Sequence, residues 1–260
     1  MTKVISIANQ KGGVGKTITA INLSSFLTIL DKKVLLIDMD PQGHSGIGLG
    51  IDIEDDEYST TYDLLINKDK TLDDCITEID IEDKTLDLVI SNVELSYAER
   101  ELEKLYRSPI QILKKKLKST IKSKTYDYIV IDCPPSLGNL AINAFLSSDT
   151  IIVPVATSFF SLHGVEKIAD TLNEIMEELE VEFDVFGLLT RYRRNQNVSH
   201  EVHQTMKEYF NNNMFKTVIR ENIDLEKAIG EGLPICEYKK SSNGYLDYKR
   251  LAMEIMSYGN

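Results

Sequence analysis

The residues best suited to chemistry form one glycine-rich stretch near the start of the sequence. Residues 9–17 read Asn-Gln-Lys-Gly-Gly-Val-Gly-Lys-Thr, between a strand-like apolar run and a helix-like run. This is the context of a phosphate-binding loop, because glycines let backbone N–H groups turn inward and the helix start adds partial positive charge. Lys16 offers a point charge to the β- and γ-phosphates of a nucleotide, and the Thr17 hydroxyl is a ligand for Mg²⁺.

A second lysine distinguishes this loop from the general Gly-x-x-x-x-Gly-Lys-Ser/Thr form. Gln10 occupies the first glycine position, and Lys11 precedes the glycine pair. Two lysines in one loop repel each other unless phosphate neutralises both. The alternative is a glycine turn that binds no ligand. The pattern Lys-Gly-Gly-x-Gly-Lys-Thr is that of the deviant Walker A loop, so the loop predicts a nucleotide site.

Three carboxylates follow predicted strands. Asp38 and Asp40 come after the apolar run 34–37 and lie two residues apart, so on a strand they point to the same side. Asp132 follows the apolar run 128–131. At the carboxyl edge of a parallel sheet such acids face the ligand crevice, where they orient water or support a metal. For a single acid at a strand end, the alternative is a helix cap or a turn.

The elements that position these residues alternate along the chain. Mostly continuous apolar runs rich in Val and Ile predict strands buried on both faces of a largely parallel sheet, at residues 4–8, 34–37, 86–90, 128–131, 151–155, 185–189 and 217–219. The predicted helices are residues 17–30, 94–105, 109–121, 165–179, 198–209 and 245–256. This alternation indicates a doubly wound α/β fold with helices flanking the sheet. We expect a single domain over residues 1–260, with surface helices and loops at 52–83.

The composition is that of a soluble globular chain, with 42% hydrophobic and 27% charged residues among 260. No apolar run approaches the ~20 residues of a membrane span, and we expect no signal peptide before the first strand. The three cysteines are widely spaced, which argues against zinc and iron–sulfur sites and suits a reducing cytoplasm.

The net charge of −12 is unevenly distributed. Residues 52–103 contain 18 acidic and 4 basic residues, residues 104–124 contain 8 basic and no acidic residues, and residues 191–220 contain 6 basic and 2 acidic residues. Overall acidity alone argues against binding to nucleic acid, but the local basic runs allow basic surfaces. Each run can also be a solvated helix face.

Together these motifs resemble the ParA/Soj-type partition ATPases, within the ParA–MinD group of deviant Walker NTPases. The resemblance spans nearly the whole chain and rests on residues 9–17, on Val-Leu-Leu-Ile-Asp-Met-Asp-Pro-Gln-Gly at 34–43 and on Tyr-Asp-Tyr-Ile-Val-Ile-Asp-Cys-Pro-Pro-Ser-Leu at 126–137. Weaker similarities are Tyr-Asp-Leu-Leu at 62–65, Leu-His-Gly at 162–164 and Thr-Val-Ile-Arg-Glu-Asn at 217–222, the last near the adenine.

The resemblance implies an ATPase that uses ATP and Mg²⁺ and closes into a homodimer with the nucleotides between the subunits. The ATP dimer is expected to bind DNA without sequence specificity. A ParB-like protein at a centromere-like site is expected to stimulate slow hydrolysis and release the dimer. The expected location is cytoplasmic and nucleoid-associated, without membrane contact, and no helix-turn-helix domain is expected before Val4.

The resemblance also implies roles for individual residues. Lys16 and Thr17 bind phosphate and Mg²⁺, Lys11 acts across the dimer, and Asp40 positions the attacking water. The implied catalytic residues are Lys11, Lys16 and Asp40. The implied nucleotide contacts are Lys11, Gly12, Gly13, Val14, Gly15, Lys16, Thr17, Ile18, Arg220 and Asn222. The implied metal-supporting residues are Thr17, Asp38 and Asp132.

The sequence departs from the family pattern in three places. Ile18 stands where a second threonine is usual, which removes a hydroxyl near the α-phosphate, and His44-Ser45 replaces Asn-Ala/Ser-Thr. Arginines that contact DNA in some relatives fall on Asn195 and Glu221. The DNA-contact candidates are therefore neighbouring arginines, with residues 114–118 as a second choice: Arg191, Arg193, Arg194 and Arg220.

Four alternatives stay open. A MinD-like membrane-cycling ATPase needs a basic amphipathic C-terminal helix, whereas residues 245–256 have no net charge and predict a helix packed on the core. A relative of the nitrogenase iron protein would need paired cysteines, and a bacterial tyrosine kinase is suggested only by the C-terminal tyrosines. A ParA relative that positions a protein cargo differs only in its partner.

Overall fold

The structure, a computed structural model, describes residues 2–55, 57–120, 125–157, 162–194, 196–210 and 213–258. In these residues the chain forms a seven-stranded sheet in the order β3-β4-β2-β5-β1-β6-β7, and only β3 runs antiparallel to its neighbour. The strands are β1 (Lys3–Ile7), β2 (Val34–Asp38), β3 (Thr77–Ile81), β4 (Lys84–Val89), β5 (Tyr128–Asp132), β6 (Thr150–Ala156) and β7 (Asp184–Thr190). The predicted doubly wound, mostly parallel sheet is confirmed.

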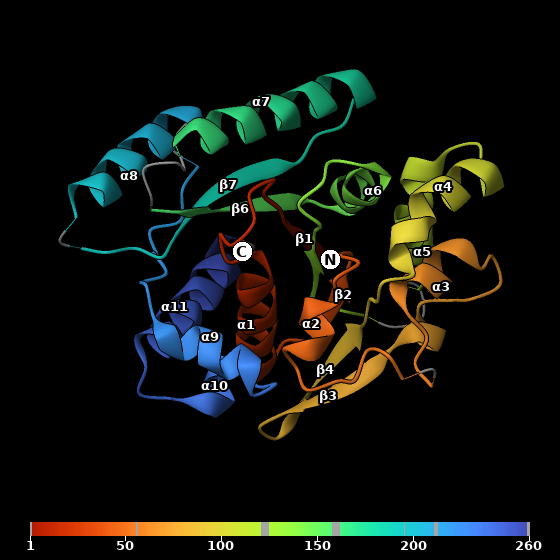
Figure 1. Ribbon diagram of the computed structural model, residues 1–260, viewed down its shortest axis with the longest axis horizontal. Helices are drawn as coiled ribbons and strands as arrows, with labels where there is room; N and C mark the ends of the chain where they lie inside the picture. Colours follow the sequence, from red (N-terminus) through yellow and green to blue (C-terminus); the bar gives the residue numbers. More distant parts are fainter. Residues whose placement is uncertain are drawn as a thin grey trace.

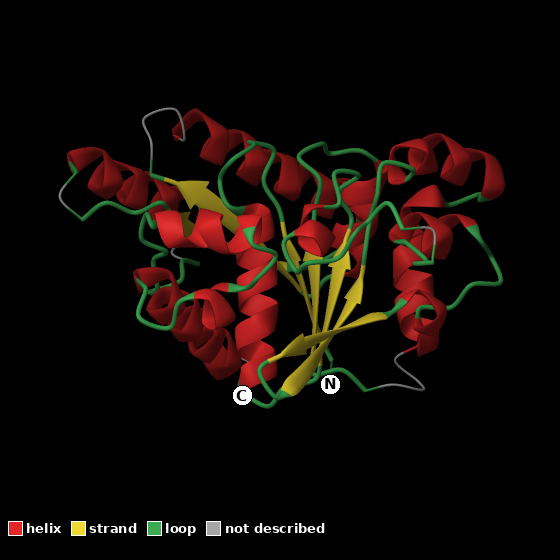
Figure 2. Cartoon of the chain, turned by 60° about the horizontal axis from the view of Figure 1, so that its bottom comes forward, coloured by secondary structure: helices red, strands yellow, loops and turns green. Residues whose placement is uncertain are grey.

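Helices cover both faces of the sheet (Figures 1 and 2). One face is covered by α1 (Lys16–Ile29), α9 (Ile223–Gly230), α10 (Ile235–Tyr238) and α11 (Asn243–Tyr258). The other is covered by α3 (Thr61–Ile66), α4 (Leu95–Leu105), α5 (Ile112–Thr120), α6 (Asn139–Ser147), α7 (Leu162–Leu179) and α8 (Asn197–Tyr209). A short helix, α2 (His44–Ile47), follows β2.

The central strands read as continuous apolar runs because both of their faces are buried. In β5, Ile129 and Ile131 belong to the core beneath α5 and α6, whereas Val130 belongs to the core beneath α1. Successive strand residues point to opposite faces, so each core takes alternate residues. The two cores lie on opposite sides of one sheet.

The six predicted helices are all present, with ends displaced by at most three residues in the described chain. The last residue of the prediction 109–121 lies outside the described residues, and its first three form a 3-10 turn, Pro109–Gln111. The sequence analysis missed the helices α6 and α9. Both are short, and α6 is buried on much of its surface, so its sequence shows little alternation of polar and apolar residues.

The prediction of surface helices and loops at 52–83 was wrong in part, because this region also contains the edge strand β3. In β3 buried Ile79 and Ile81 alternate with exposed Glu78 and Asp80. Such alternation is typical of a strand with one solvated face, and the search for continuous apolar runs passed over it. A two-residue turn then leads into β4.

The predicted strand at 217–219 was also wrong. Ile219 donates its backbone N–H to Leu189 O of β7 at 2.8 Å, but the described residues around this segment form only isolated bridges, at Gly187–Met214 and Tyr192–Arg220. The reason is a carboxylate of α11: Glu254 accepts the backbone N–H groups of residues 216 and 217, at 2.7 and 2.9 Å. These donors therefore do not join the β7 ladder.

The C-terminal helix α11 packs against α1, as the sequence predicted. Tyr248, Leu251, Ala252 and Ile255 are buried in the shared core, and the Tyr248 hydroxyl lies 3.0 Å from Thr19 Oγ1 of α1. The apolar face of α11 is thus occupied by the protein itself. Among the described helices, none combines the length and apolar character needed to cross a bilayer.

Candidate nucleotide site

The site forms where three neighbouring strands end. Strand β5 lies between β1 and β2, and Asp132 at its end is in register with Ile7 of β1 and Asp38 of β2. The loop 9–17 continues from β1, so it passes over the ends of these strands. The topology therefore brings together the loop and two of the acids that the sequence singled out.

The phosphate-binding loop is fixed by hydrogen bonds to β6 and β7, the two strands on one side of β1. Asn9 donates its side-chain amide to Pro154 O of β6 (2.7 Å) and accepts the Lys11 backbone N–H (2.9 Å). Thr190, the last residue of β7, donates its hydroxyl to Val14 O (2.8 Å). Gly15 precedes α1 with φ 89°, a left-handed conformation that glycine adopts without strain. The loop thus holds its N–H groups at the start of α1 in a set geometry.

Two buried aspartates lie behind the loop, joined by a serine. Asp38 accepts backbone N–H groups from Asp40 and Ser45, both at 2.9 Å, and the Ser45 hydroxyl donates to Asp132 Oδ2 at 3.0 Å. Ser45 was named in the sequence only as a departure from the family pattern. Its spacing, two residues after a glycine that follows Asp-Pro-Gln, was the available signal for this bracing role.

Burial perturbs both carboxyl groups. Desolvation, reinforced by the nearby Asp132, raises the pKa of Asp38 well above its ordinary value. Desolvation also raises the pKa of Asp132 to about 6, opposed by the hydroxyls of Thr17 and Ser45 and by the Lys16 ammonium. Ionising both buried carboxyl groups at once is unfavourable, and a bound cation would stabilise their ionised forms.

An unpartnered oxygen indicates where such a cation would bind. Asp132 Oδ1 is buried and has no hydrogen-bond partner in the described chain. Among the described residues no three His, Cys, Asp or Glu side chains gather into a metal cage. Mg²⁺ commonly takes one or two protein oxygens and completes its shell with water and phosphate. The residues present, Asp132 with the Thr17 hydroxyl, fit that ion.

The remaining catalytic candidates lie around this centre. Lys16 is 8% exposed, and it lies close enough to Asp132 to lower the pKa of that carboxyl group. Asp40 is half-buried, two residues beyond Asp38, and its Oδ1 accepts the Gln42 backbone N–H at 3.1 Å. The Lys11 side chain is half-buried at the front of the loop and makes no ion pair with described residues.

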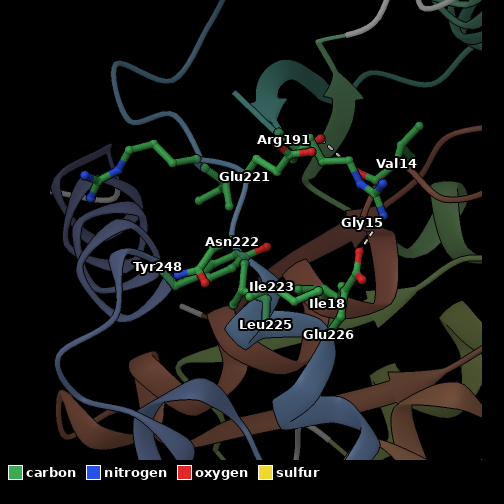
Figure 3. A pocket seen from close by; sticks show the side chains of 13 residues that line it. Val14, Gly15, Ile18, Arg191, Glu221, Asn222, Ile223, Leu225, Glu226 and Tyr248 are labelled. Carbon is green, nitrogen blue, oxygen red and sulfur yellow. Dashed lines mark hydrogen bonds and ion pairs between the residues drawn. The ribbon is translucent and has the colours of Figure 1, made fainter. Parts of the chain in front are cut away.

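A cavity of about 470 Å³ opens beside the loop, on the side of β7 (Figure 3). Its size suits a nucleoside. Arg220 and Asn222, the residues that the sequence placed near an adenine, both line it. Ile18 of α1 and Tyr248 of α11 line it too. The remaining lining residues come from the loop, from β7 and the segment after it, and from the start of α9: Val14, Gly15, Thr190, Arg191, Ile219, Glu221, Ile223, Leu225 and Glu226.

The arginines predicted to contact DNA differ in their surroundings. Three of them are paired with acids: Arg191 with Glu226, Arg193 with Glu221, and Arg220 with Asp247. Arg194 has no ion-pair partner in the described chain and lines a separate cleft of about 400 Å³. That cleft is also lined by Lys216 and Arg250 and by the Arg220–Asp247 ion pair. We call the three cations that form no ion pair among the described residues, Arg194, Lys216 and Arg250, the basic cleft.

The second-choice basic run at 114–118 is partly used for folding. Lys116 of α5 donates its ammonium to the carbonyl oxygens of residues 67, 68 and 70, at 2.8, 3.3 and 2.5 Å. These carbonyls follow the end of α3, so the lysine caps that helix. Asn195 lies outside the described residues, as do the side chains of the family-like Leu-His-Gly at 162–164.

Comparison with known proteins places the chain in a family. A family model described as an AAA domain matches residues 2–185. Soj, the sporulation initiation inhibitor protein of Bacillus subtilis, is 38% identical over 260 residues, covering 100% of both chains. The chain belongs to the Soj/ParA family of P-loop ATPases. The resemblance expected from residues 9–17, 34–43 and 126–137 is thereby confirmed.

Two further similarities bear on this Soj/ParA family member. The chromosome partitioning protein ParA of Caulobacter vibrioides is 35% identical, covering 98% of this chain and 94% of its own. The solved structure of cobyrinic acid a,c-diamide synthase from Mycobacterium smegmatis, with bound ADP and magnesium, is 25% identical, with a TM-score of 0.84 over 100% of this chain and 96% of that chain. The fold thus serves more than one chemistry, so function must be argued from the site.

Proposed function

We propose that the protein is a DNA-segregation ATPase that dimerises on ATP. The observation that carries the proposal is the convergence of the two-lysine loop, the braced aspartates and the nucleoside-sized cavity at one sheet edge. The match to Soj and ParA over nearly the full length supports the same function. We place the protein in the cytoplasm, on the nucleoid.

Phosphate binding falls to the loop backbone and Lys16. Thr17 and Asp132 would hold Mg²⁺, which when bound neutralises charge on the phosphates. The Asp40 carboxylate, which is more exposed than that of Asp38, would orient the attacking water and accept its proton. Lys11, at the front of the loop, would reach the nucleotide of a second copy. Hydrolysis is then slow in the monomer, because its nucleotide site lacks the Lys11 side chain that a second copy would supply.

DNA binding is assigned to the basic cleft. Its three cations form no ion pair in the described chain. By contrast, Arg191, Arg193 and Arg220, the last of which also lines the cleft, are paired with acids that neutralise much of their charge. Each chain carries −12, so a concentrated basic surface is needed to overcome long-range repulsion. Contacts to phosphates alone give binding without sequence specificity and with steep salt dependence.

The deciding experiment measures the gel retardation of a random DNA duplex by the protein at low salt. It is carried out with ATP and Mg²⁺, with ADP, and without nucleotide. We expect binding only with ATP. Asp40→Ala should lose hydrolysis yet keep the phosphate contacts, so it should elute as a persistent dimer with ATP and still bind DNA. Absence of DNA binding in both proteins would contradict the proposal. A monomeric Asp40→Ala protein would contradict the role of Asp40.

The stimulating partner is proposed to be a ParB-like protein bound at a centromere-like DNA site. Affinity capture with the Asp40→Ala protein and ATP identifies it, since the trapped dimer presents the partner surface for longer. A DNA-binding partner would support segregation of plasmid or chromosome. A partner that belongs to a protein assembly and binds no DNA would instead indicate positioning of a protein cargo.

A further inference from the structure

An ion pair crosses the cavity beside the phosphate-binding loop. Arg191, directly after β7, and Glu226 of α9 stand on opposite walls and point toward each other (Figure 3). The Arg191 Nη2 and Glu226 Oε1 atoms lie 3.0 Å apart. The two side chains are 49% and 53% exposed. An exposed pair of this kind adds little stability and is readily exchanged for other partners.

The backbone that carries Arg191 is held in an unusual conformation. Its φ is 49°, in the left-handed region that residues other than glycine seldom adopt. Thr157 donates its hydroxyl to Arg191 O at 2.8 Å, and the preceding residue, Thr190, is bonded to Val14 of the loop. Backbone strain that the surrounding structure maintains is often found at ligand sites. Here it directs a guanidinium group across a cavity that the phosphate-binding loop also lines.

The other charged residues that line the cavity are engaged elsewhere. Arg220 donates to the carboxylate of Asp247 through Nε and Nη2, at 2.9 and 2.7 Å, and Asp247 is 3% exposed. Glu221 is paired with Arg193, which does not line the cavity. Among the described lining residues, Arg191 and Glu226 are therefore the opposite charges that are paired with each other across the cavity, so one ligand can contact both.

We propose that Arg191 and Glu226 exchange their mutual ion pair for contacts to the nucleotide, which rests on the nucleotide binding proposed above. The Arg191 guanidinium binds the phosphate nearest the ribose, since its planar fork matches phosphate oxygens. The Glu226 carboxylate accepts a hydrogen bond from the ribose 2′-hydroxyl, as acids do in other nucleotide sites. The pair thus selects phosphorylated ribonucleosides, in a cavity where Ile18 offers no hydroxyl to the phosphate.

Calorimetry with ADP and Mg²⁺, adenosine, and 2′-deoxy-ADP tests the two contacts. Arg191→Met keeps a long side chain on the same left-handed backbone, so it should lower ADP affinity roughly tenfold or more and leave adenosine affinity unchanged. Glu226→Ala should remove the preference for ADP over 2′-deoxy-ADP that the unaltered protein shows. Lys239→Met is the control, because it breaks another ion pair to α9, with Asp224, that does not line the cavity. Its nucleotide affinities should not change.

The outcomes separate the two proposals. ADP affinity within threefold of the unaltered protein in Arg191→Met, or an equal loss for adenosine, overturns the phosphate contact. Full discrimination against 2′-deoxy-ADP in Glu226→Ala overturns the ribose contact. If the unaltered protein binds ADP but both variants behave like Lys239→Met, only the Arg191–Glu226 proposal fails. If the unaltered protein binds no nucleotide, both proposals fail.

Discussion

The two ends of the candidate site are built in different ways. At the phosphate end, which comprises residues 9–17 with Asp38, Ser45 and Asp132, the acids are fully buried and bonded to backbone or hydroxyl groups. The base end comprises residues 190–194 and 219–226 with the adjoining basic cleft, and two of its ion pairs, Arg191–Glu226 and Arg193–Glu221, are exposed. The first end fixes a geometry that phosphate chemistry requires. The second holds charges that can change partners, so substitutions there should tune binding rather than abolish it.

The strongest test of this contrast compares the two loop lysines. Lys16→Ala removes the buried ammonium at the phosphates and should abolish detectable nucleotide binding. Lys11→Ala removes a half-buried side chain that we assign to the nucleotide of a second copy, so nucleotide binding should persist while the ATP dimer no longer forms. Calorimetry with ADP and size-exclusion chromatography with ATP measure the two effects. Equal losses of nucleotide affinity in both variants would contradict the distinction.

A glycine behind the phosphate end should be nearly as sensitive. Gly43 has φ 65°, and a Cβ there would lie 2.5 Å from Ser91 O. Gly43→Ala should therefore destabilise the protein by at least ~2 kcal/mol, which lowers Tm by roughly 4–8 °C. Gly230→Ala is the control, since a Cβ at the end of α9 meets no atom within 4 Å and should leave Tm unchanged or slightly raised. Equal Tm values for the two variants would show that the loop rearranges freely.

At the base end, paired and unpaired arginines should differ in their effect on DNA binding. Replacing Arg194, Lys216 and Arg250 with alanine should weaken binding strongly and lower the salt slope by roughly 0.9 for each DNA phosphate that is no longer neutralised. Arg193→Ala removes a cation whose charge Glu221 already offsets, so the slope should change little. Fluorescence anisotropy with ATP across a salt series gives both slopes. A larger slope change in Arg193→Ala than in the triple variant would contradict the assignment of DNA binding to the basic cleft.

A pH dependence of stability is also expected in the nucleotide-free protein. The folded pKa of Asp132 is raised to about 6, above its unfolded value of 3.8, so the folded state binds more protons between these values. Its contribution to stability is therefore complete below about pH 4 and is lost as pH rises through about 6. Urea unfolding should show Asp132→Asn gaining stability relative to the unaltered protein over this interval.

An exposed aspartate provides the control of opposite sign. Hydrogen bonds from Thr71 lower the pKa of Asp74, so its contribution is present above pH 3.8 and lost as pH falls through the lowered value. Asp74→Asn should therefore lose stability relative to the unaltered protein at neutral pH and recover at low pH. Parallel curves for both variants would contradict the burial argument for Asp132.

The sequence could predict that residues 9–17 and the strand-end acids meet at one sheet edge, because that prediction depends on local spacing and on the order of the elements. Residues 9–17 and the strand-end acids carry their meaning within a few positions, and the alternating elements then bring them to one sheet edge. The base end could not be predicted in the same way. Arg191 and Glu226 are 35 positions apart, and neither residue type nor spacing indicates that they meet. Likewise, the capture of two backbone donors by Glu254 shows why the apolar run at 217–219 forms no strand.

The acidic residues on the edge strand β3 disfavour the pairing of this edge with another molecule. One side of its backbone faces no further strand of the described sheet, and such an edge can recruit a strand from another molecule. Its solvated face carries Glu78 and Asp80, and like charges would be brought together by any edge-to-edge pairing of two copies. A protein proposed to crowd along DNA meets its own copies at high local concentration. The acids on β3 would keep that crowding from becoming aggregation.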